Sequence, residues 1–412
     1  MGPIRSPYQQ RKASTPLALV LGSALAFLVM FELLLRGSVP YLPLRYHKYL
    51  PGEMFMLAQH SKRALIPHDY VAIFGDSYAQ GAGDWYEHAV RRDWGEGRAY
   101  QAAHVIFEAT GRDVVSFGAS GAGSFDGLVY FPLRLRAKLA ARGIDLEAPR
   151  QIVAYFFEGN DLNNNLNLME RHWQRVTGRP AVTGEPGEMV GFLRALLDRY
   201  RGRLDEPLRL SDRLYLARFA TVLYGDLRRT TKPWLDRDKA KPLPPTAIRL
   251  GGATRDLPSP LHAPALDLDE QERQRALLVF RAALALAKDT FAPIPILLVY
   301  VPSPLAVYEL AAERVPVDAY DGPHQVHASA EVDRQSERIC VRVADIAAAV
   351  GVDFLDSRPA LRAIARDRLI HGPGDWKHFN RTGYEALGRA IAQALEGNRS
   401  AGHCQAALTA GR

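Results

Sequence analysis

Residues 71–78 read Val-Ala-Ile-Phe-Gly-Asp-Ser-Tyr, and this stretch decides the fold class. Four apolar residues, two of them β-branched, are typical of a short buried strand. The glycine and aspartate that follow favour a turn, so the strand is expected to end before them. Ser77 is therefore expected just beyond the tip of a strand, where open α/β sheets assemble their sites.

Further apolar runs of strand length alternate along the chain with stretches of helical spacing. Strands are expected at 71–74, 113–117, 151–157, 296–301 and 352–355, and helices at 89–110, 131–142, 270–289, 332–350 and 384–395. Short apolar strands that alternate with helices predict a parallel sheet with both faces covered. The expected fold class is therefore α/β, a three-layer α/β/α sandwich around a parallel five-stranded sheet, flavodoxin-like in architecture.

Residues 163–268 fit this alternation poorly, and we interpret them as a helical insertion. Met189, Leu193 and Leu197 follow helical spacing, and a similar pattern continues over residues 214–223. Residues 232–268 are rich in proline and polar residues, which indicates an extended loop. The insertion is expected to cap the site or to present a surface to a partner. The apolar faces of its helices favour packing in a core over binding to a membrane.

The N-terminal region contains one long apolar run. Residues 16–35 read PLALVLGSALAFLVMFELLL, with Glu32 as the single charge, which is long enough to span a bilayer. Three basic residues and no acid precede the run, which favours a cytoplasmic N-terminus. No small-x-small cleavage site follows, so an uncleaved single-pass anchor is expected.

These features predict the following organisation. A cytoplasmic tail covers 1–15, a transmembrane anchor 16–36, a juxtamembrane connector 37–65, the main domain 66–398 and a tail 399–412. The main domain is expected on the periplasmic or extracellular side of the cytoplasmic membrane.

The net charge and the cysteine content bear on two further questions, whether the protein binds nucleic acid and whether it contains a disulfide. The net charge is +7, but the 52 Lys and Arg residues are scattered among acids and form no basic stripe. Nucleic-acid binding is therefore not expected. The two cysteines, Cys340 and Cys404, could form a disulfide in an oxidising compartment or remain unpaired thiols, and the sequence leaves this open.

Four short polar blocks follow predicted strands or precede the final helix. They are Gly75-Asp76-Ser77, Gly118-Ala119-Ser120-Gly121, Glu158-Gly159-Asn160-Asp161 and Asp375-Trp376-Lys377-His378. A serine nucleophile needs a base, and the base needs a carboxylate that orients it. Ser77, His378 and Asp375 supply these three groups. The elbow of ordinary α/β-hydrolases is absent, because Ala79 stands where its last glycine would be.

The order and spacing of these blocks resemble the SGNH family, also called GDSL hydrolases, over residues 66–396. The resemblance implies that Ser77 is the nucleophile, His378 the general base and Asp375 the residue that orients its imidazole. It also implies an oxyanion hole made of the Ser77 backbone N–H, the Gly121 N–H and the Asn160 side chain. Gly118 is a rival to Gly121 for the glycine position.

Together with the apolar run at 16–35, the resemblance implies a membrane-anchored serine esterase that removes acyl or acetyl groups from O-acylated glycans or lipids. The same site could instead transfer an acyl group to an extracellular polysaccharide, or the domain could be a non-catalytic assembly component. An acylated glycan or small molecule is the expected partner besides the membrane. No cofactor and no metal are expected, and the sequence identifies no protein partner.

Overall fold

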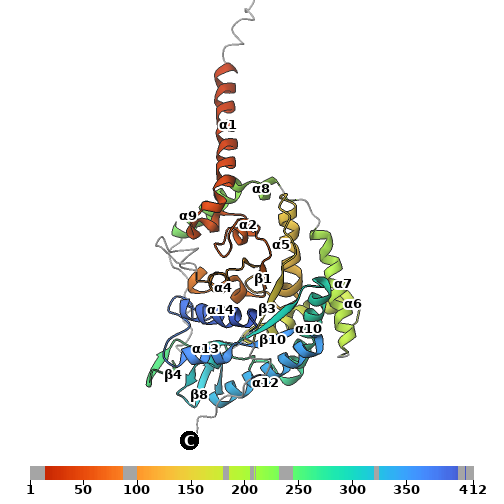
Figure 1. The fold of residues 1–412 in the computed structure, drawn as a ribbon, viewed down its shortest axis with the longest axis vertical. Helices are drawn as coiled ribbons and strands as arrows, with labels where there is room; N and C mark the ends of the chain where they lie inside the picture. The colour runs from red at the N-terminus through yellow and green to blue at the C-terminus, as the bar shows by residue number, and fades with distance from the viewer. Residues whose placement is uncertain are drawn as a thin grey trace, which may run out of the picture.

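The computed structural model describes residues 14–86, 100–179, 185–204, 208, 210–231, 245–319, 324–397 and 404. A five-stranded sheet lies at the centre of the domain (Figure 1). Its strands run in the order β10 (Asp353–Asp356), β6 (Ile296–Val301), β3 (Gln151–Phe157), β1 (Val71–Phe74) and β2 (Val114–Ser116), and every pair is parallel. The fold class is α/β, as the sequence predicts, and all five expected strands are present.

Helices cover both faces of this sheet, because successive strand residues alternate between two hydrophobic cores. In β1, Ala72 and Phe74 point into one core, whereas Val71 and Ile73 point into the other. The first core is covered by η5 (Asp126–Tyr130), α5 (Phe131–Ala140), α6 (Asp161–Thr177), α7 (Pro186–Leu204), α10 (Glu270–Thr290) and most of α12 (Ser329–Val350). The second is covered by α4 (Ala102–Thr110), α13 (Arg358–Ala365) and α14 (Arg381–Leu395). Residues 87–99, which include the start of the helix expected at 89–110, lie outside the described residues.

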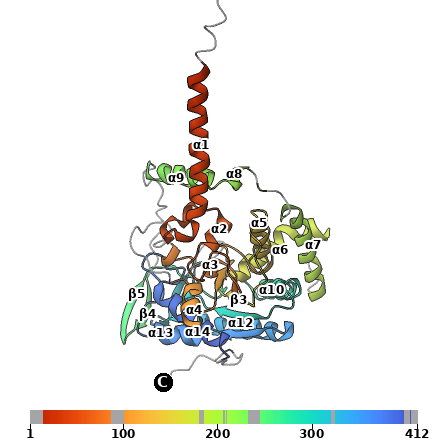
Figure 2. The same cartoon turned by 45° about the horizontal axis from the view of Figure 1, so that its top comes forward.

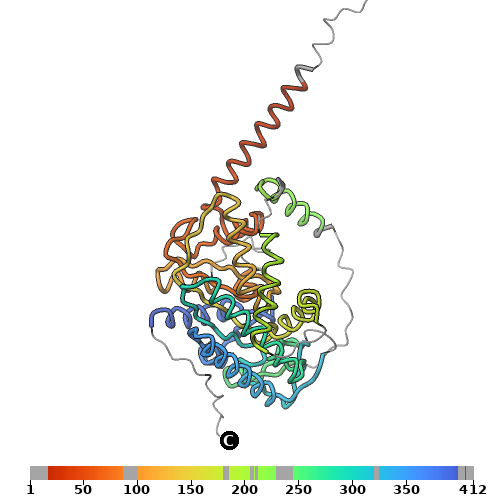
Figure 3. Tube along the Cα trace, turned by 90° about the vertical axis from the view of Figure 1, so that its right-hand side faces the viewer, coloured from red at the N-terminus to blue at the C-terminus, as the bar shows by residue number. Residues whose placement is uncertain are grey.

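The N-terminal helix α1 (Ser14–Ser38) projects from one end of the domain, and α12 lies at the other end (Figures 1 and 3). Within the described chain, one helical stretch, Leu17–Tyr41, is long and apolar enough to cross a membrane, with a mean hydropathy of 2.4. Beyond α1, η2 (Val39–Tyr41), η3 (Leu44–Tyr49) and α2 (Gly52–Leu57) fold against the domain. Val39, Met54 and Leu57 are buried in the first core, so this connector packs as part of the globular body.

The region between β3 and α10 contains α6, α7, α8 (Leu210–Arg213) and α9 (Tyr215–Thr231). Helices α7 and α9 agree with the helical spacing of the sequence, whereas α6 and α8 were not expected. The expectation of an extended loop over 232–268 is wrong in part. Residues 246–257 form an antiparallel hairpin of β4 (Thr246–Leu250) and β5 (Ala253–Leu257), and residues 232–244 lie outside the described part of the chain.

The hairpin turns at Gly251 and Gly252, which have φ values of +57° and +80°. A glycine pair with positive φ is the signal of a two-residue hairpin turn, and the sequence interpretation missed it. β4 also pairs with β7 (Glu309–Leu310), and β8 (Arg314–Val317) pairs with β9 (Gln325–Ala328) beside it.

Candidate active site

Ser77 is the first residue of the short helix α3 (Ser77–Gln80), directly beyond β1. The chain turns sharply at Gly75, where φ is +145° and a Cβ atom would lie 2.9 Å from the Cβ of Tyr155. Only glycine fits this turn. Asp76 caps α3, since its carboxylate accepts a hydrogen bond of 2.9 Å from the Tyr78 N–H. The local sequence therefore holds the serine at a fixed strand end.

His378 lies against Ser77 and is held by Asp375. Its Nε2 is 2.9 Å from the Ser77 Oγ, and its Nδ1 is 2.7 Å from the Asp375 Oδ2. The three residues that the sequence singled out thus form one hydrogen-bonded chain, although Ser77 and His378 are 301 positions apart. This arrangement allows the imidazole to take the serine proton while the carboxylate fixes its tautomer.

The ionisation of Asp375 suits this arrangement. Burial alone would raise its pKa, but the hydrogen bond and positive charge of His378 and the N–H groups of Lys377 and His378 outweigh burial. The pKa of Asp375 is lowered to about 2. The carboxylate is therefore ionised at neutral pH and can stabilise an imidazolium.

Contacts with Asp84, Tyr78 and Gly83 hold the loop that carries His378 in place. The Asp375 N–H donates to the Asp84 Oδ1 at 3.0 Å, and the Tyr78 hydroxyl donates to the Lys377 carbonyl at 2.7 Å. At Gly83, where φ is +105°, a Cβ atom would lie 2.8 Å from the Cβ of His378. The sequence interpretation missed Asp84 and Gly83, for which the run Gly81-Ala82-Gly83-Asp84 was the available signal.

Two buried carboxyl groups, those of Asp76 and Asp161, follow the strands β1 and β3. Burial raises the pKa of Asp76 to about 6, although the hydrogen bond from the Tyr78 N–H opposes this shift. Burial, together with the negative charge of Asp76, also raises the pKa of Asp161, which accepts a 3.0 Å hydrogen bond from the Phe157 N–H. Both side chains bond to the backbone of turns that follow β1 and β3, so they support the site instead of facing a substrate.

The residues expected in an oxyanion hole follow β2 and β3, the two strands that flank β1. Gly121 is exposed, with φ of +76°, and Asn160 begins α6 without a side-chain capping bond. Among the described residues, no hydrogen bond links either one to the chain of Ser77, His378 and Asp375. The Asn160 Oδ1 is buried and has no partner within the same described set.

Gly118 has a different environment. A Cβ atom there would lie 2.3 Å from the Gln80 N and 2.5 Å from the Ala79 carbonyl carbon, so the residue packs tightly on the helix that begins with Ser77. Its N–H donates to the Ser116 Oγ at 3.3 Å. This glycine is thus required for the close approach of the β2 loop to α3.

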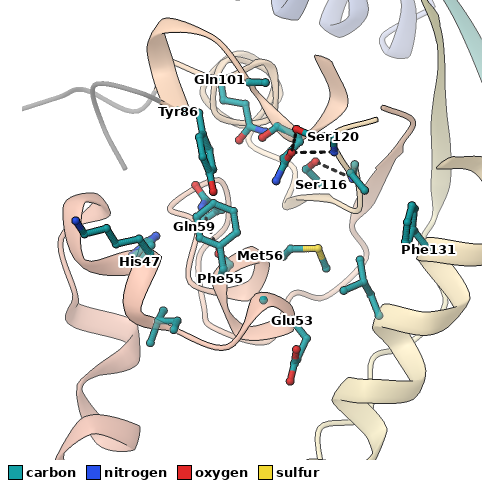
Figure 4. Close-up of a pocket in the computed structure, with 18 of the residues that line it drawn as sticks. His47, Glu53, Phe55, Met56, Gln59, Tyr86, Gln101, Ser116, Ser120 and Phe131 are labelled. Carbon is teal, nitrogen blue, oxygen red and sulfur yellow. Dashed lines mark hydrogen bonds between the residues drawn. The ribbon is translucent and has the colours of Figure 1, made fainter. Parts of the chain in front are cut away.

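A large cavity, with a volume of about 1310 Å³, reaches Asp375 and His378. Its walls come from η3 and α2 on one side and from α5 and the loop after β2 on the other (Figure 4). Residues of α9 also line the cavity. His47, Phe55 and Gln59 line the first side, and Ser116 and Ser120 line the second. The segment expected to be a connector therefore forms part of the wall.

One cluster of potential metal ligands occurs among the described residues, and it lies outside this cavity. It comprises Cys340, Asp356 and Cys404. The two sulfur atoms are joined in a disulfide, which resolves the question that the sequence leaves open. A disulfide sulfur is not a thiolate, so this cluster does not suit a metal ion.

Comparison with known proteins gives little guidance. No family model and no curated protein sequence matches the chain. Among solved structures, the chain is similar to a catalytic mutant of an acetylxylan esterase from Geobacillus stearothermophilus, with 12% sequence identity and a TM-score of 0.33. The match covers 80% of this chain and 95% of that protein. At this TM-score the likeness carries no conclusion about activity.

Proposed function

We propose that the chain is a membrane-anchored serine esterase that removes acyl groups from O-acylated glycans or lipids. The observation that carries the proposal is the hydrogen-bonded chain from the Ser77 Oγ through His378 to Asp375. Such a chain is the arrangement that nucleophilic acyl transfer requires. The resemblance of the four sequence blocks to SGNH hydrolases supports the same roles.

In the proposed reaction, the Ser77 Oγ attacks the ester carbonyl carbon while the His378 Nε2 accepts its proton. The imidazolium then returns that proton to the departing alcohol, which leaves an acyl-enzyme. A water molecule attacks the acyl-enzyme in the same way, with His378 again as base, and releases the carboxylic acid. Asp375 remains ionised and stabilises the imidazolium in both halves.

The tetrahedral intermediate needs hydrogen-bond donors for its oxyanion, and we assign the Ser77 N–H, the Gly121 N–H and the Asn160 side-chain amide. Two observations support this choice. The Gly118 N–H is already bonded to Ser116, which leaves Gly121 as the better candidate. The Asn160 side chain is not used as a helix cap. Losing one such donor typically costs about 3 kcal/mol of transition-state stabilisation, so Asn160→Ala is expected to lower kcat about 100-fold.

The test uses the full chain in detergent micelles, with nitrophenyl acetate as substrate and a fluorophosphonate probe for the nucleophile. We expect covalent labelling and turnover in the natural sequence, and the loss of both in Ser77→Ala and in His378→Ala. Ser329→Ala is the matched control and should behave like the natural sequence, because Ser329 begins α12 and its hydroxyl donates to the Ala312 carbonyl. Turnover that survives Ser77→Ala would overturn the assignment.

Transfer of the acyl group to a polysaccharide hydroxyl is the second candidate. The size of the cavity supports this candidate, because a volume of about 1310 Å³ exceeds that of a usual pocket for one small ligand. An acceptor sugar could then occupy the cavity beside the acyl-enzyme. If the acyl group is transferred, added glycan should accelerate the consumption of the ester, and mass spectrometry should detect acyl groups on the glycan. If the ester is hydrolysed, the free acid should be the only acyl product.

A further inference from the structure

The helix α9 exposes an apolar side to the outside of the protein. Leu223, Tyr224 and Leu227 are 39%, 68% and 59% exposed, and they lie within two turns of one another. Apart from α1, few large apolar side chains of the described residues are this exposed. An exposed apolar helix face beside a membrane anchor is typical of a surface that contacts a membrane or another protein.

The opposite side of α9 lines the cavity that reaches His378. Arg218, Val222 and Gly225 contribute to the cavity wall. At 3.6 residues per turn, these positions point away from Leu223, Tyr224 and Leu227 by about half a turn. One side of α9 therefore forms part of the cavity wall, and its opposite, apolar side is exposed on the surface of the protein.

The start of α9 is fastened to α1. The Glu32 carboxylate of α1 accepts hydrogen bonds from the Tyr215 N–H at 3.0 Å and from the Leu216 N–H at 2.9 Å. The rings of Phe31 and Phe219 also meet edge to face, with centroids 6.4 Å apart. Figure 2 shows α9 lying across the base of α1. Because of these contacts, the position of α9 follows that of the anchor.

The height of this attachment along α1 indicates where α9 lies relative to a bilayer. Glu32 is 15 residues beyond Leu17, where the candidate span begins, which corresponds to about 22 Å of helix. A bilayer has a hydrocarbon core of about 30 Å. Leu33 and Leu34, immediately beyond Glu32, are still 64% and 61% exposed. A core of about 30 Å that begins at Leu17 therefore ends about 8 Å beyond Glu32. The beginning of α9 thus lies within the depth of about 5–10 Å to which interfacial helices bury their apolar face.

We propose that α9 lies in the interface of the membrane that α1 spans, with Leu223, Tyr224 and Leu227 in contact with lipid. Amphipathic helices bind in this way, with the helix axis along the membrane surface and the apolar face among the acyl chains. In this position α9 separates the cavity from the bilayer, and the cavity can bind esters that are located at the membrane surface. This second consequence depends on the proposed esterase activity, whereas the position of α9 depends on the proposed membrane anchor alone.

The position of α9 is tested by spin labelling of the full chain in liposomes of phosphatidylethanolamine and phosphatidylglycerol. The sequence has only two cysteines and these pair with each other, so Tyr224→Cys introduces a single reactive thiol. Val341→Cys, 42% exposed on α12 at the far end of the domain, is the matched control. We expect the ratio of oxygen to nickel-chelate accessibility to be at least threefold higher for the label at 224.

Two results would overturn the proposal. Equal ratios at 224 and 341 would place α9 in water. Low accessibility of the label at 224 to both reagents would indicate that protein, either a second copy or another chain, covers this face.

The consequence for substrates is tested by comparing an ester carried on a liposome lipid with soluble nitrophenyl acetate. In the double variant Leu223→Ser and Leu227→Ser, we expect the ratio of lipid-borne to soluble turnover to fall about tenfold. Val326→Ser, 43% exposed on β9, should leave the ratio unchanged. An unchanged ratio in the double variant would refute membrane-side delivery. Absence of all turnover in the natural sequence would refute the esterase, and the spin-label result would then stand by itself.

Discussion

At the scale of the single residue, the ionised carboxylate of Asp375 is expected to orient the His378 imidazole and to stabilise its protonated form. Its carboxylate is 2.7 Å from the His378 Nδ1, and its pKa is lowered to about 2. Asp375→Asn removes the negative charge and favours the wrong imidazole tautomer, so kcat is expected to fall by about 10³ or more with little change in KM. Steady-state kinetics on nitrophenyl acetate measure this. Asp367→Asn, an exposed residue upstream in the chain, is the control, and a drop of similar size there would contradict the assignment.

Asp76 gives a prediction for pH. Its folded-state pKa is raised to about 6 by burial, so the folded protein binds more protons than the unfolded chain between about pH 4 and pH 6. The contribution of Asp76 to stability is therefore fully present below about pH 4 and is lost as the pH rises through about 6. Asp76→Asn keeps an oxygen that can accept from the Tyr78 N–H but cannot ionise.

The variant should lose less stability than the natural sequence between pH 4 and pH 7, by roughly 2 kcal/mol. Urea unfolding of the full chain in detergent at both pH values checks this. Asp345→Asn, at an exposed position of α12, should leave the pH dependence as it was. A parallel pH dependence in Asp76→Asn and the natural sequence would show that Asp76 does not carry the effect.

At the scale of the element, the loop that carries His378 depends on the turn at Gly83. There φ is +105°, and a Cβ atom would lie 2.8 Å from both the His378 Cβ and the Phe379 carbonyl oxygen. Gly83→Ala is expected to displace the imidazole from Ser77 and to lower kcat by 10-fold or more. Gly143→Ala is the matched control, because φ is also positive there, at +78°, but nothing lies within 4 Å. Equal kcat values in the two variants would contradict the role of Gly83.

At the scale of the whole molecule, the disulfide between Cys340 and Cys404 fastens the C-terminal tail to α12. Its sequence separation is 64 residues, for which loop-closure entropy corresponds to about 4 kcal/mol at most. Cys404→Ser should lower the free energy of unfolding by about 2 to 4 kcal/mol, and added reductant should lower that of the natural sequence equally. Urea unfolding with and without reductant measures both. If reductant lowers the free energy of unfolding of the Cys404→Ser variant further, the disulfide does not account for the effect.

The sequence by itself determined the five strands and most of the flanking helices, and it singled out Ser77, Asp375 and His378, which the structure joins by hydrogen bonds. Apolar periodicity and turn residues are local properties, so a strand such as 151–157 and the serine after 71–74 can be read from neighbouring positions. The hairpin at 246–257 was also local, but its glycine pair was overlooked in a proline-rich stretch.

Only the tertiary structure decided which distant residues meet. Asp84 reaches the Asp375 N–H across 291 positions, and Glu32 caps α9 across more than 180. The pairing of Cys340 with Cys404 likewise depends on where the tail returns. These contacts depend on how helices and strands pack in three dimensions, which no short stretch of sequence specifies. For the same reason, the cavity between the anchor-proximal helices and His378 could not be predicted from the sequence.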